Sequence, residues 1–188
     1  MNKTKKAIFH SAIKIFSKSG YNGATMDDIA FNAGVAKGTL YYHFRSKEEI
    51  FKYIIKEGTS IIIERMECIA KNEHDALSKL KALCKIQLSL VYENRDFFKV
   101  IMSQLWGQEL RQLELRHTIK GYINYIEKYL RQSIDEGSIK NGEVSFMAYT
   151  IFGTICSATV YELINEDDRD IHEVNDNLVG YILSGIKK

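Results

Sequence analysis

Apolar residues recur at helical spacing along almost the whole chain. In the first segment Phe9, Ala12, Ile13 and Phe16 lie at positions i, i+3, i+4 and i+7, so they share one face of a predicted helix. Gly20 should end this helix, because glycine readily leaves the helical conformation. The chain contains no proline, a residue that ends helices and marks many loops. The pattern therefore predicts an all-α protein.

Two short helices are expected next, on either side of a glycine. Thr25 is a suitable N-cap residue, and Asp28 three residues later completes an acidic variant of the capping box. The first short helix should run to about Ala33. Gly34 can take the positive φ of a tight turn, and a second short helix should begin near Ala36. This arrangement predicts a helix-turn-helix, whose second helix enters the DNA major groove.

Longer helices should follow the two short ones. Ser46 caps a predicted helix that runs to about Lys71, and Gly137 is a predicted C-terminal cap further along the chain. Further helices are expected over residues 75–93, 97–108, 143–166 and 171–186, and a long helix that holds Leu115 to Leu130 should end at Asp135-Glu136-Gly137. We place the domain boundary near Lys52, inside a helix. The expected architecture is an N-terminal helix-turn-helix domain (1–52) and a C-terminal helical domain (53–188), which the family resemblance given below makes a ligand-binding and dimerisation domain.

Charge is distributed unevenly along the 188 residues. Residues 1–50 hold eight Lys and Arg against four acids, and the remaining residues hold eighteen against twenty. A basic head on a near-neutral body suits DNA docking, although a solvated lysine-rich N-terminus would look the same. The basic N-terminus lacks the apolar core of a signal peptide, and no run looks long and apolar enough to span a bilayer. We therefore expect a cytoplasmic protein.

Motifs for enzymatic chemistry are absent from the sequence. There is no P-loop, G-x-S-x-G or dinucleotide-binding motif, and the five histidines show no metal-ligand spacing. The three cysteines are far apart, which indicates buried thiols rather than a disulfide framework. The acidic run Glu166-Asp167-Asp168 is expected to be a solvated loop. We expect no catalytic residue, metal or cofactor, although a helical ligand carrier or an enzyme without DNA binding is the rival class.

Residues 25–50 carry the string T-x-x-x-I-A-x-x-A-G-V-x-K-G-T-L-Y-x-H-F-x-S-K-E-E-I. Together with the basic first helix, this string is very similar to the DNA-binding domain of the TetR/AcrR family of transcriptional regulators. The resemblance covers residues 5 to 52. It implies an all-helical homodimer that usually represses transcription from a palindromic operator. It also implies release from DNA when a small molecule binds the C-terminal domain.

The candidate DNA-binding residues lie around the second short helix. Small or hydrogen-bonding residues at its start should let the backbone approach base edges, and later hydroxyl, imidazole and ammonium groups can donate to phosphates. The residues expected to read bases are Lys37, Gly38, Thr39 and Tyr41. Those expected to contact phosphates are Thr25, Tyr42, His43 and Lys47.

The candidate ligand site draws on aromatic and soft residues in the middle of the chain. These are Phe98, Met102, Trp106, Tyr122, Tyr125, Tyr149 and Phe152. Any one of them could equally be plain core, because aromatic residues at helical spacing usually are. The family resemblance implies that some of them line a cavity that is mostly apolar.

A second resemblance bears on the ligand. Residues 108–143, followed by YTIFGT at 149–154, are similar to the fatty-acid-degradation repressors within the family. Those respond to long-chain acyl-CoA, which implies that cations near the cavity bind the coenzyme's phosphates. Arg111 is the leading candidate, with Arg116 and Lys120, although ion pairs with nearby Glu109 and Glu114 are the alternative. The other ligand class is lipophilic or cationic drugs and dyes, in a regulator of an efflux gene.

The last two predicted helices carry the candidate dimer interface. Small residues four apart would let helices approach closely, and the apolar positions repeat on one face of each helix. The candidate interface residues are Gly153, Ser157, Val160 and Ile164 on the first helix and Val174, Leu178 and Ile182 on the second. These faces could instead pack only within their own subunit. The family resemblance places the dimer here.

Overall fold

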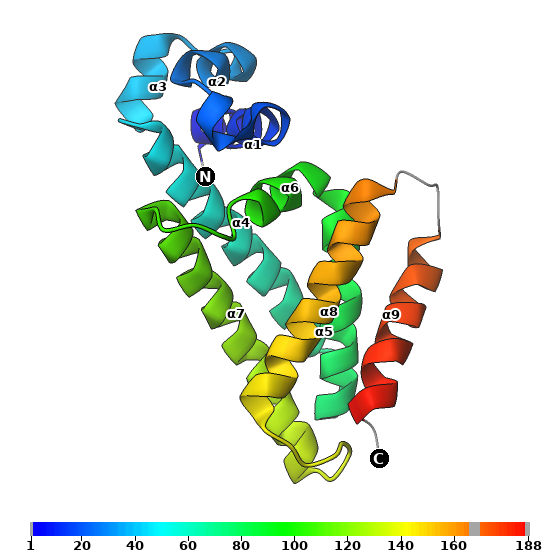
Figure 1. The fold of residues 1–188 in the computed structure, drawn as a ribbon. Coiled ribbons are helices and arrows are strands. Elements are labelled where there is room, and N and C mark those ends of the chain that lie inside the picture. The colour runs from blue at the N-terminus through cyan, green and yellow to red at the C-terminus, as the bar shows by residue number, and fades with distance from the viewer. Residues whose placement is uncertain (1, 166–169, 187–188) are drawn as a thin grey trace. The chain divides into compact units, whose positions relative to one another are not determined.

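The computed structural model describes residues 2–165 and 170–186, and every regular element among them is a helix (Figure 1). This confirms the all-α expectation. The elements are α1 Lys3–Gly23, α2 Met26–Ala33, α3 Lys37–His43, α4 Lys47–Ala70, α5 Ala76–Glu93, α6 Arg95–Ser103, α7 Leu110–Asp135, α8 Val144–Ile164 and α9 Ile171–Ile186. The expected acidic loop at Glu166-Asp167-Asp168 lies outside the described residues.

The chain forms two compact units, and each is built from two separate stretches. Unit 1 comprises Met1–Ser60 and Arg95–Thr118, and unit 2 comprises Ile61–Asn94 and Ile119–Lys188. Helices α4 and α7 therefore each contribute to both units. Unit 1 combines the predicted helix-turn-helix domain with α6 and the first part of α7. The domain boundary near Lys52 remains a prediction. The compact units divide α4 after Ser60 instead, and they group residues 95–118 with the helix-turn-helix.

The local signals in unit 1 act as the sequence indicates. Gly20 interrupts α1 with φ 69°, and the Thr25 hydroxyl accepts from the Asp28 backbone N–H at 3.1 Å. The Asp28 carboxylate accepts in return from the Thr25 N–H at 3.3 Å, which completes the capping box. Gly34 adopts the left-handed conformation with φ 65°, and Ser46 caps α4 by accepting from the Glu49 N–H. These caps fix the turn that orients α3 against α2.

The core of unit 1 fixes the position of α3. Leu40 is the only fully buried residue of α3, and the neighbouring helices of unit 1 supply further buried apolar residues. That shared core comprises Ile8, Phe9, Ala12, Phe16, Ile29, Ala30, Phe44, Ile50, Phe51 and Ile54. Burial of these side chains stabilises the unit by about 25 cal/mol per Å² of apolar surface. A single anchor leaves the rest of the α3 surface free for other contacts.

Helix α6 belongs to the same unit because it packs directly on α1 and α4. Phe97 is buried, and a Cβ on Gly58 of α4 would overlap its ring. The Ser17 hydroxyl of α1 donates to the Asp96 carboxylate at 2.6 Å. Glycine at position 58 is therefore required by the close approach of α6. The start of α6 is fixed relative to the helix-turn-helix by these two contacts.

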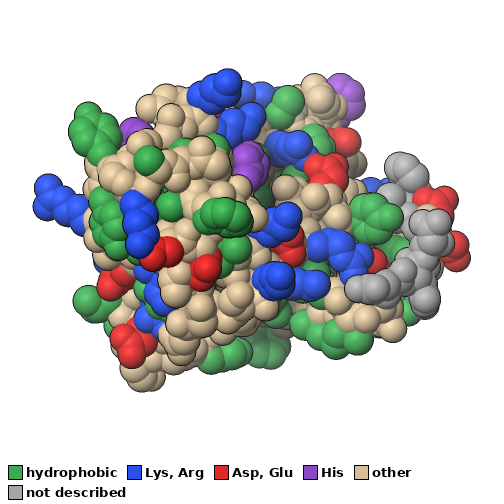
Figure 2. All heavy atoms as spheres, turned by 90° about the horizontal axis from the view of Figure 1, so that it is seen from above, with side chains coloured by type: hydrophobic (Ala, Val, Ile, Leu, Met, Phe, Trp, Pro, Cys, Tyr) green, Lys and Arg blue, Asp and Glu red, His purple; other side chains and the backbone are tan. Residues whose placement is uncertain are grey.

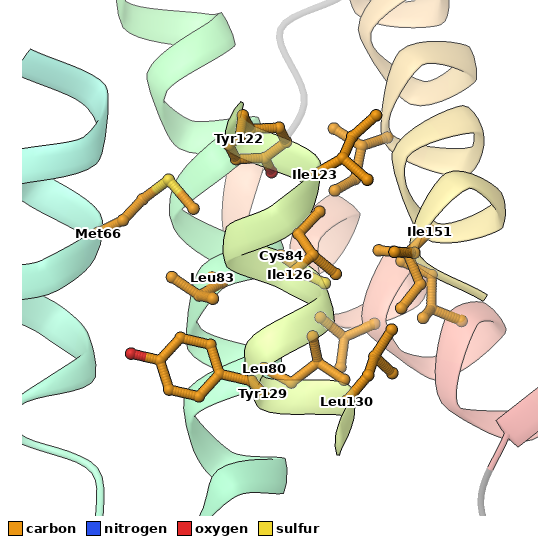
Figure 3. Packing of buried hydrophobic residues seen from close by; sticks show 14 of the residues in the cluster. Met66, Leu80, Leu83, Cys84, Tyr122, Ile123, Ile126, Tyr129, Leu130 and Ile151 are labelled. Atoms are coloured by element: carbon orange, nitrogen blue, oxygen red, sulfur yellow. The ribbon is translucent and has the colours of Figure 1, made fainter. Parts of the chain in front are cut away.

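The core of unit 2 is formed by parts of α4 and α7 together with α5, α8 and α9 (Figure 3). Asp75 caps α5 by accepting from the Ser78 N–H at 2.8 Å. Gly137 has φ 71° just beyond α7, as expected of a C-terminal glycine cap. The predicted inner face of α5, which includes Leu80, Leu83 and Cys84, is buried. Unit 2 is thus a helical bundle with a continuous apolar interior.

Three sequence expectations need correction. Helix α6 ends at Ser103 rather than near residue 108, so Trp106 lies in an irregular segment and is 79% exposed. Cys68 is an exposed thiol, whereas Cys84 is buried as expected. Helix α8 is long and apolar enough to cross a membrane by length and composition, although the sequence analysis found no such run. Only 22% of its most apolar window is buried, so much of this apolar helix faces outward.

Candidate DNA interface and effector site

The exposed surface of α3 is the candidate DNA interface. Lys37, Gly38, Thr39, Tyr41 and Tyr42 are exposed, and His43 is half-buried. The ring of Tyr42 lies against the imidazole of His43, with ring centroids 5.1 Å apart. The helix therefore presents hydroxyl, imidazole and ammonium groups together with a glycine backbone. This combination can donate hydrogen bonds to phosphates and to acceptors on base edges.

Gly38 has a distinctive role on this surface. A Cβ built on it would meet no other atom within 4 Å, and its φ is not in the left-handed region. Neither packing within the protein nor backbone conformation requires a glycine here. Glycine also has a lower intrinsic helix propensity than alanine. The open space beside Gly38 would admit a partner that approaches the helix backbone from outside.

Lys37 is already paired in the free protein. Its ammonium lies 2.5 Å from the Asp27 carboxylate, and both side chains are more than half exposed. The hydrogen bond to Asp27 raises the pKa of Lys37, so the amine stays charged. A pair this exposed contributes little to stability. Reading bases would require Lys37 to exchange Asp27 for an acceptor on DNA, and the sequence analysis gave no sign of this competition.

Lys47 points inward to the protein backbone. Its ammonium donates to the carbonyl oxygens of Ala24 at 2.9 Å and Asn22 at 3.3 Å, and it lies over the Tyr21 ring. Burial and the nearby Arg111 cation lower the pKa of Lys47. Lys47 thus ties the start of α4 to the turn between α1 and α2. Its predicted phosphate contact remains a prediction, and the structure adds a positioning role.

Basic side chains on α1 add to the positive charge near the interface. Lys3, Lys6, Lys14 and Lys18 are exposed, and Figure 2 shows Lys and Arg side chains spread over the face that includes α1 to α3. Lys5 differs from them, because its ammonium lies over the rings of Phe44 and Tyr53 at 5.7 and 5.5 Å. The exposed cations can attract a polyanion without reading its sequence.

The eight candidate ligand residues are divided between the two units. Phe98, Met102, Trp106 and Arg111 belong to unit 1. Tyr122, Tyr125, Tyr149 and Phe152 belong to unit 2. Each unit is therefore considered separately. In unit 1, Phe98 is buried, Met102 is half-buried and Trp106 is 79% exposed, so these three candidates do not share one environment.

The arginines proposed for phosphate binding are engaged within unit 1. The Arg111 guanidinium lies 3.9 Å from the centre of the Tyr21 ring, and its Nε donates to the Gln104 side chain at 3.2 Å. Arg116 donates to the Leu105 carbonyl oxygen at 3.1 Å. Only a weak 3.8 Å pair joins Arg111 to Glu109, and Glu114 pairs with Lys52 at 2.9 Å. Both arginines therefore hold local structure.

Of the four candidates in unit 2, Tyr122, Tyr125 and Phe152 lie in its core or against it, whereas Tyr149 is 50% exposed and lies outside it. Tyr122 and Tyr129 are buried, and the rings of Tyr122 and Phe152 are 6.0 Å apart. Tyr125 and Tyr129 form a hydroxyl pair at 3.3 Å. The hydroxyl of Tyr122 has no hydrogen-bond partner in the described part of the chain, and neither has the side-chain oxygen of Gln87. Gln87 was not among the ligand candidates from sequence, because glutamine on an apolar helix face carries no motif.

Thiol chemistry is suppressed inside unit 2. Burial raises the pKa of the Cys84 thiol to about 12 and that of Cys156 to about 11. Both therefore stay protonated near neutral pH and are poor nucleophiles. Among the described residues, no three or more His, Cys, Asp or Glu side chains are grouped so that they could hold a metal ion.

The candidate dimer residues fall into two groups. On α8, Gly153, Ser157, Val160 and Ile164 are exposed, and Ile164 is 72% accessible. Phe146 and Tyr149 extend the same exposed apolar surface. On α9, Leu178 and Ile182 are buried in the core of their own unit, and Val174 packs against that core. This burial agrees with the alternative that these α9 positions pack within their own subunit, and the exposed surface of this helix carries Gly180, Tyr181 and Ser184.

Comparison with known proteins assigns both parts of the chain. Residues 8–54 match the model for bacterial regulatory proteins of the tetR family, and residues 55–185 match the C-terminal region of YsiA-like proteins. A fatty acid metabolism regulator protein from Bacillus subtilis is 34% identical over 186 residues, which is 95% of this chain and 93% of the relative. A negative regulator of the icaADBC biofilm operon from Staphylococcus aureus is 46% identical over 146 residues, covering 76% and 75% of the two chains.

A solved structure agrees with these relationships. The transcriptional regulator FadR from Bacillus subtilis, in complex with stearoyl-CoA, superimposes with a TM-score of 0.87 at 27% identity, and the match covers 96% of this chain and 98% of that one. The relatives are transcriptional regulators rather than enzymes. The capped α2–α3 turn, the exposed α3 surface and the helical unit 2 agree with the same assignment. This chain is a member of the TetR family of bacterial transcriptional regulators.

Proposed function

We propose that the protein is a cytoplasmic, homodimeric repressor that leaves its operator when long-chain acyl-CoA binds the C-terminal domain. The observation that carries the effector assignment is the similarity over nearly the whole chain to a regulator bound to stearoyl-CoA. The relative named as a fatty acid metabolism regulator supports the same effector class.

DNA binding by the α3 surface is supported by its geometry. Thr25, Lys37, Thr39 and Tyr42 are exposed, and Gly38 leaves open space against the helix backbone. We assign Lys37, Gly38, Thr39 and Tyr41 to base edges. We assign Thr25, Tyr42 and His43 to phosphates, with Lys47 mainly positioning the turn that presents Thr25. Two copies related by a two-fold axis would read the half-sites of a palindrome.

Dimerisation is proposed through the exposed apolar surface of α8. An apolar helix of 21 residues with so little of its surface buried would be costly to leave in water. Phe146, Tyr149, Val160 and Ile164 would be covered by the same surface of a second copy. Gly153 and Ser157 would let the two α8 helices approach closely. On α9 we assign Tyr181 and its small neighbours to the interface in place of Leu178 and Ile182.

Regulation requires a difference in affinity between two states. The effector must bind more tightly to a form in which the two recognition helices do not match the operator spacing. Helices α4 and α7 each contribute residues to both units. A change in their bending or rotation inside unit 2 would therefore be transmitted to the α3 surface. This transmission is the proposed mechanism of release.

A gel-shift titration tests the proposal. The purified protein should retard the DNA upstream of its own gene in the presence of excess random competitor, and stearoyl-CoA should release that DNA at micromolar concentration. Coenzyme A alone serves as the control for the nucleotide part. Failure to prefer any duplex would contradict operator binding. Specific binding that stearoyl-CoA leaves unchanged would contradict the effector assignment alone.

The second candidate function is regulation of an efflux gene by drugs or dyes, because other branches of the family respond to such ligands. Acidic groups inside the ligand site would favour a cationic ligand. In the described core of unit 2, the buried acid is Glu162 of α8. A cationic dye in the same gel shift therefore distinguishes an efflux regulator from a fatty acid regulator. Release by the dye, without release by stearoyl-CoA, would favour the efflux function.

A further inference from the structure

Several buried polar atoms inside unit 2 lack hydrogen-bond partners in the described part of the chain, the Ser133 hydroxyl and the Asn175 side-chain oxygen among them. Two others are the hydroxyl oxygen of Tyr122 and the side-chain oxygen of Gln87. The two residues are only 7% exposed, so bulk water does not satisfy these atoms. Burying a polar group without a partner is unfavourable, and native proteins rarely do so without a reason such as a bound ligand. These two atoms therefore mark a place where a bound molecule could supply the missing bonds.

The surroundings of Tyr122 are otherwise apolar. Its ring lies against Phe152 of α8, and the nearest ionisable neighbours are the thiols of Cys84 and Cys156. Burial raises the pKa of the Tyr122 hydroxyl, which keeps it a neutral donor. Thiols are weak acceptors, so they do not compensate for the loss of water. By contrast, the Tyr129 hydroxyl on the same helix donates to the Tyr125 hydroxyl at 3.3 Å.

The helix register places Gln87 near the depth of Tyr122. In the view of Figure 3, Leu80 of α5 lies at the height of Tyr129 and Leu130 of α7, and Cys84 lies at the height of Ile126 one turn further along. The two helices run in opposite directions (Figure 1). One more turn along α5 reaches Gln87, and one more turn back along α7 reaches Tyr122 and Ile123. The unpaired acceptor and the unpaired donor thus belong to the same layer of the bundle.

We propose that Tyr122 and Gln87 bind the head of an acyl-pantetheine thioester. The Tyr122 hydroxyl would donate to the thioester carbonyl oxygen. The Gln87 side-chain oxygen would accept from the nearest amide N–H of the pantetheine arm. This inference rests on the proposed effector class and adds the part of the effector that is recognised.

The donor and the acceptor together select the thioester over a free fatty acid. A carboxylate could accept from Tyr122, but it has no N–H to offer Gln87, and burying its charge here would be costly because the neighbouring groups are neutral. An acyl-pantetheine carries both required groups at one end and a hydrocarbon chain at the other. The same chemistry occurs on coenzyme A and on an acylated carrier protein. Short acyl-pantetheine, which lacks the nucleotide and the protein, contains only the shared part.

Calorimetry on the full-length protein tests the inference with two variants. Tyr122→Phe removes only the hydroxyl, and Gln87→Leu removes the acceptor at similar volume. We expect each to weaken stearoyl-CoA binding about five- to tenfold, because each removes one buried hydrogen bond to the ligand. Tyr129→Phe is the matched control, since it removes a hydroxyl that is already paired. It should leave the stearoyl-CoA affinity unchanged.

Thermal unfolding without effector provides an independent measurement. Tyr122→Phe should leave the melting temperature unchanged or raise it, because it removes an unsatisfied group. Tyr129→Phe should lower it, because it breaks the pair with Tyr125. A lower melting temperature for Tyr122→Phe would overturn the inference by showing that the hydroxyl is needed for folding. Operator affinity without effector should stay at the wild-type value in all three variants, and a loss of it would also count against the inference.

The probes separate failure of this inference from failure of the proposed function. If the wild-type protein binds stearoyl-CoA and both variants bind it equally well, the thioester contacts are wrong and the effector assignment stands. Equal affinity for stearate and stearoyl-CoA would also overturn the inference. Stearoyl-pantetheine should retain the sensitivity to both substitutions. If the wild-type protein binds none of these probes, both the proposed function and this inference fall.

Discussion

The guanidinium of Arg111 lies over the ring of Tyr21, with its central carbon 3.9 Å from the ring centre. Lys47 lies over the same ring at 4.7 Å, and it also holds the backbone carbonyls of Asn22 and Ala24. One aromatic side chain at the end of α1 therefore contacts cations from the starts of α4 and α7. This contact joins the helix-turn-helix to the first turn of α7 within unit 1. It also gives Arg111 a structural role, whereas the sequence analysis assigned this residue to phosphate binding.

Substitution of Arg111 separates these two roles. Arg111→Lys keeps the positive charge but loses the stacked plane and the fixed donor to Gln104. We expect the free energy of unfolding to fall by about 1 kcal/mol, a typical value for such a cation–π contact, with stearoyl-CoA affinity unchanged. Urea denaturation and calorimetry measure the two quantities, and Lys99→Arg on the exposed side of α6 is the control. Unchanged stability together with weaker stearoyl-CoA binding would restore the phosphate role.

Replacing Gly38 tests the approach of DNA to α3. Gly38→Ala places a methyl group in open space, so folding should be unaffected or stabilised by up to about 1 kcal/mol. Operator affinity should nevertheless fall at least tenfold, because the methyl group occupies the space that DNA requires. Fluorescence anisotropy and thermal unfolding measure the two effects. Gly34→Ala provides the contrast, because its positive φ makes alanine destabilising. Operator binding by Gly38→Ala at wild-type strength would place the DNA elsewhere.

The pairing of Lys37 with Asp27 predicts that Asp27 weakens DNA binding. Asp27→Asn removes a negative charge beside the recognition helix and frees the Lys37 amine. We expect tighter operator binding, by about two- to fivefold at low salt, with a smaller gain at high salt because the effect is electrostatic. Lys37→Ala should weaken operator binding more than binding to random DNA. Anisotropy titrations at several salt concentrations measure both, and weaker binding by Asp27→Asn would show that the pair itself is needed on DNA.

Buried thiols predict how stability depends on alkaline pH. The pKa of Cys84 is about 12 and that of Cys156 about 11 in the folded protein, against an ordinary value of 9.0. The unfolded chain therefore loses these protons first, so unfolding becomes easier as the pH rises from about 9 towards 11. Urea denaturation across this range should show a falling free energy of unfolding. Cys84→Ala should make that fall shallower, and an unchanged slope would contradict the assigned pKa.

The exposed end of α8 predicts the effect of a charge in the dimer interface. Ile164→Asp introduces a carboxylate on a surface that is 72% accessible in one subunit, so the fold should persist. Burying that charge against a second copy is unfavourable, and we expect monomers by light scattering together with loss of operator binding. Lys140→Asp, an exposed change outside α8, is the control. A dimer that persists in Ile164→Asp would move the interface to another surface.

Local chemistry explains how much of the fold could be predicted from the sequence. Thr25, Asp28, Gly34 and Ser46 act through hydrogen bonds and backbone preferences within a few residues, so their positions predict the caps and the turn. The helical period predicts the buried face of α5 for the same reason. Trp106 shows where such local prediction fails. Apolar residues recur past Ser103, at Leu105 and Trp106, but the backbone leaves the helix at Ser103.

Only the tertiary structure decided which partners the long side chains take. The sequence predicts that Arg111 and Lys47 bind phosphates. In the structure both lie over the ring of Tyr21, and Lys47 also donates to two backbone carbonyl oxygens more than 20 positions away in the chain. Leu178 and Ile182 repeat like interface residues, yet they are buried in their own core. The sequence determined where helices begin, where they turn and which family they resemble, because those properties are local or carried by a motif. Which face of each helix meets which neighbour depends on packing between distant segments. An apolar helix face has the same sequence pattern whether it packs inside its own subunit or against a second copy of the chain.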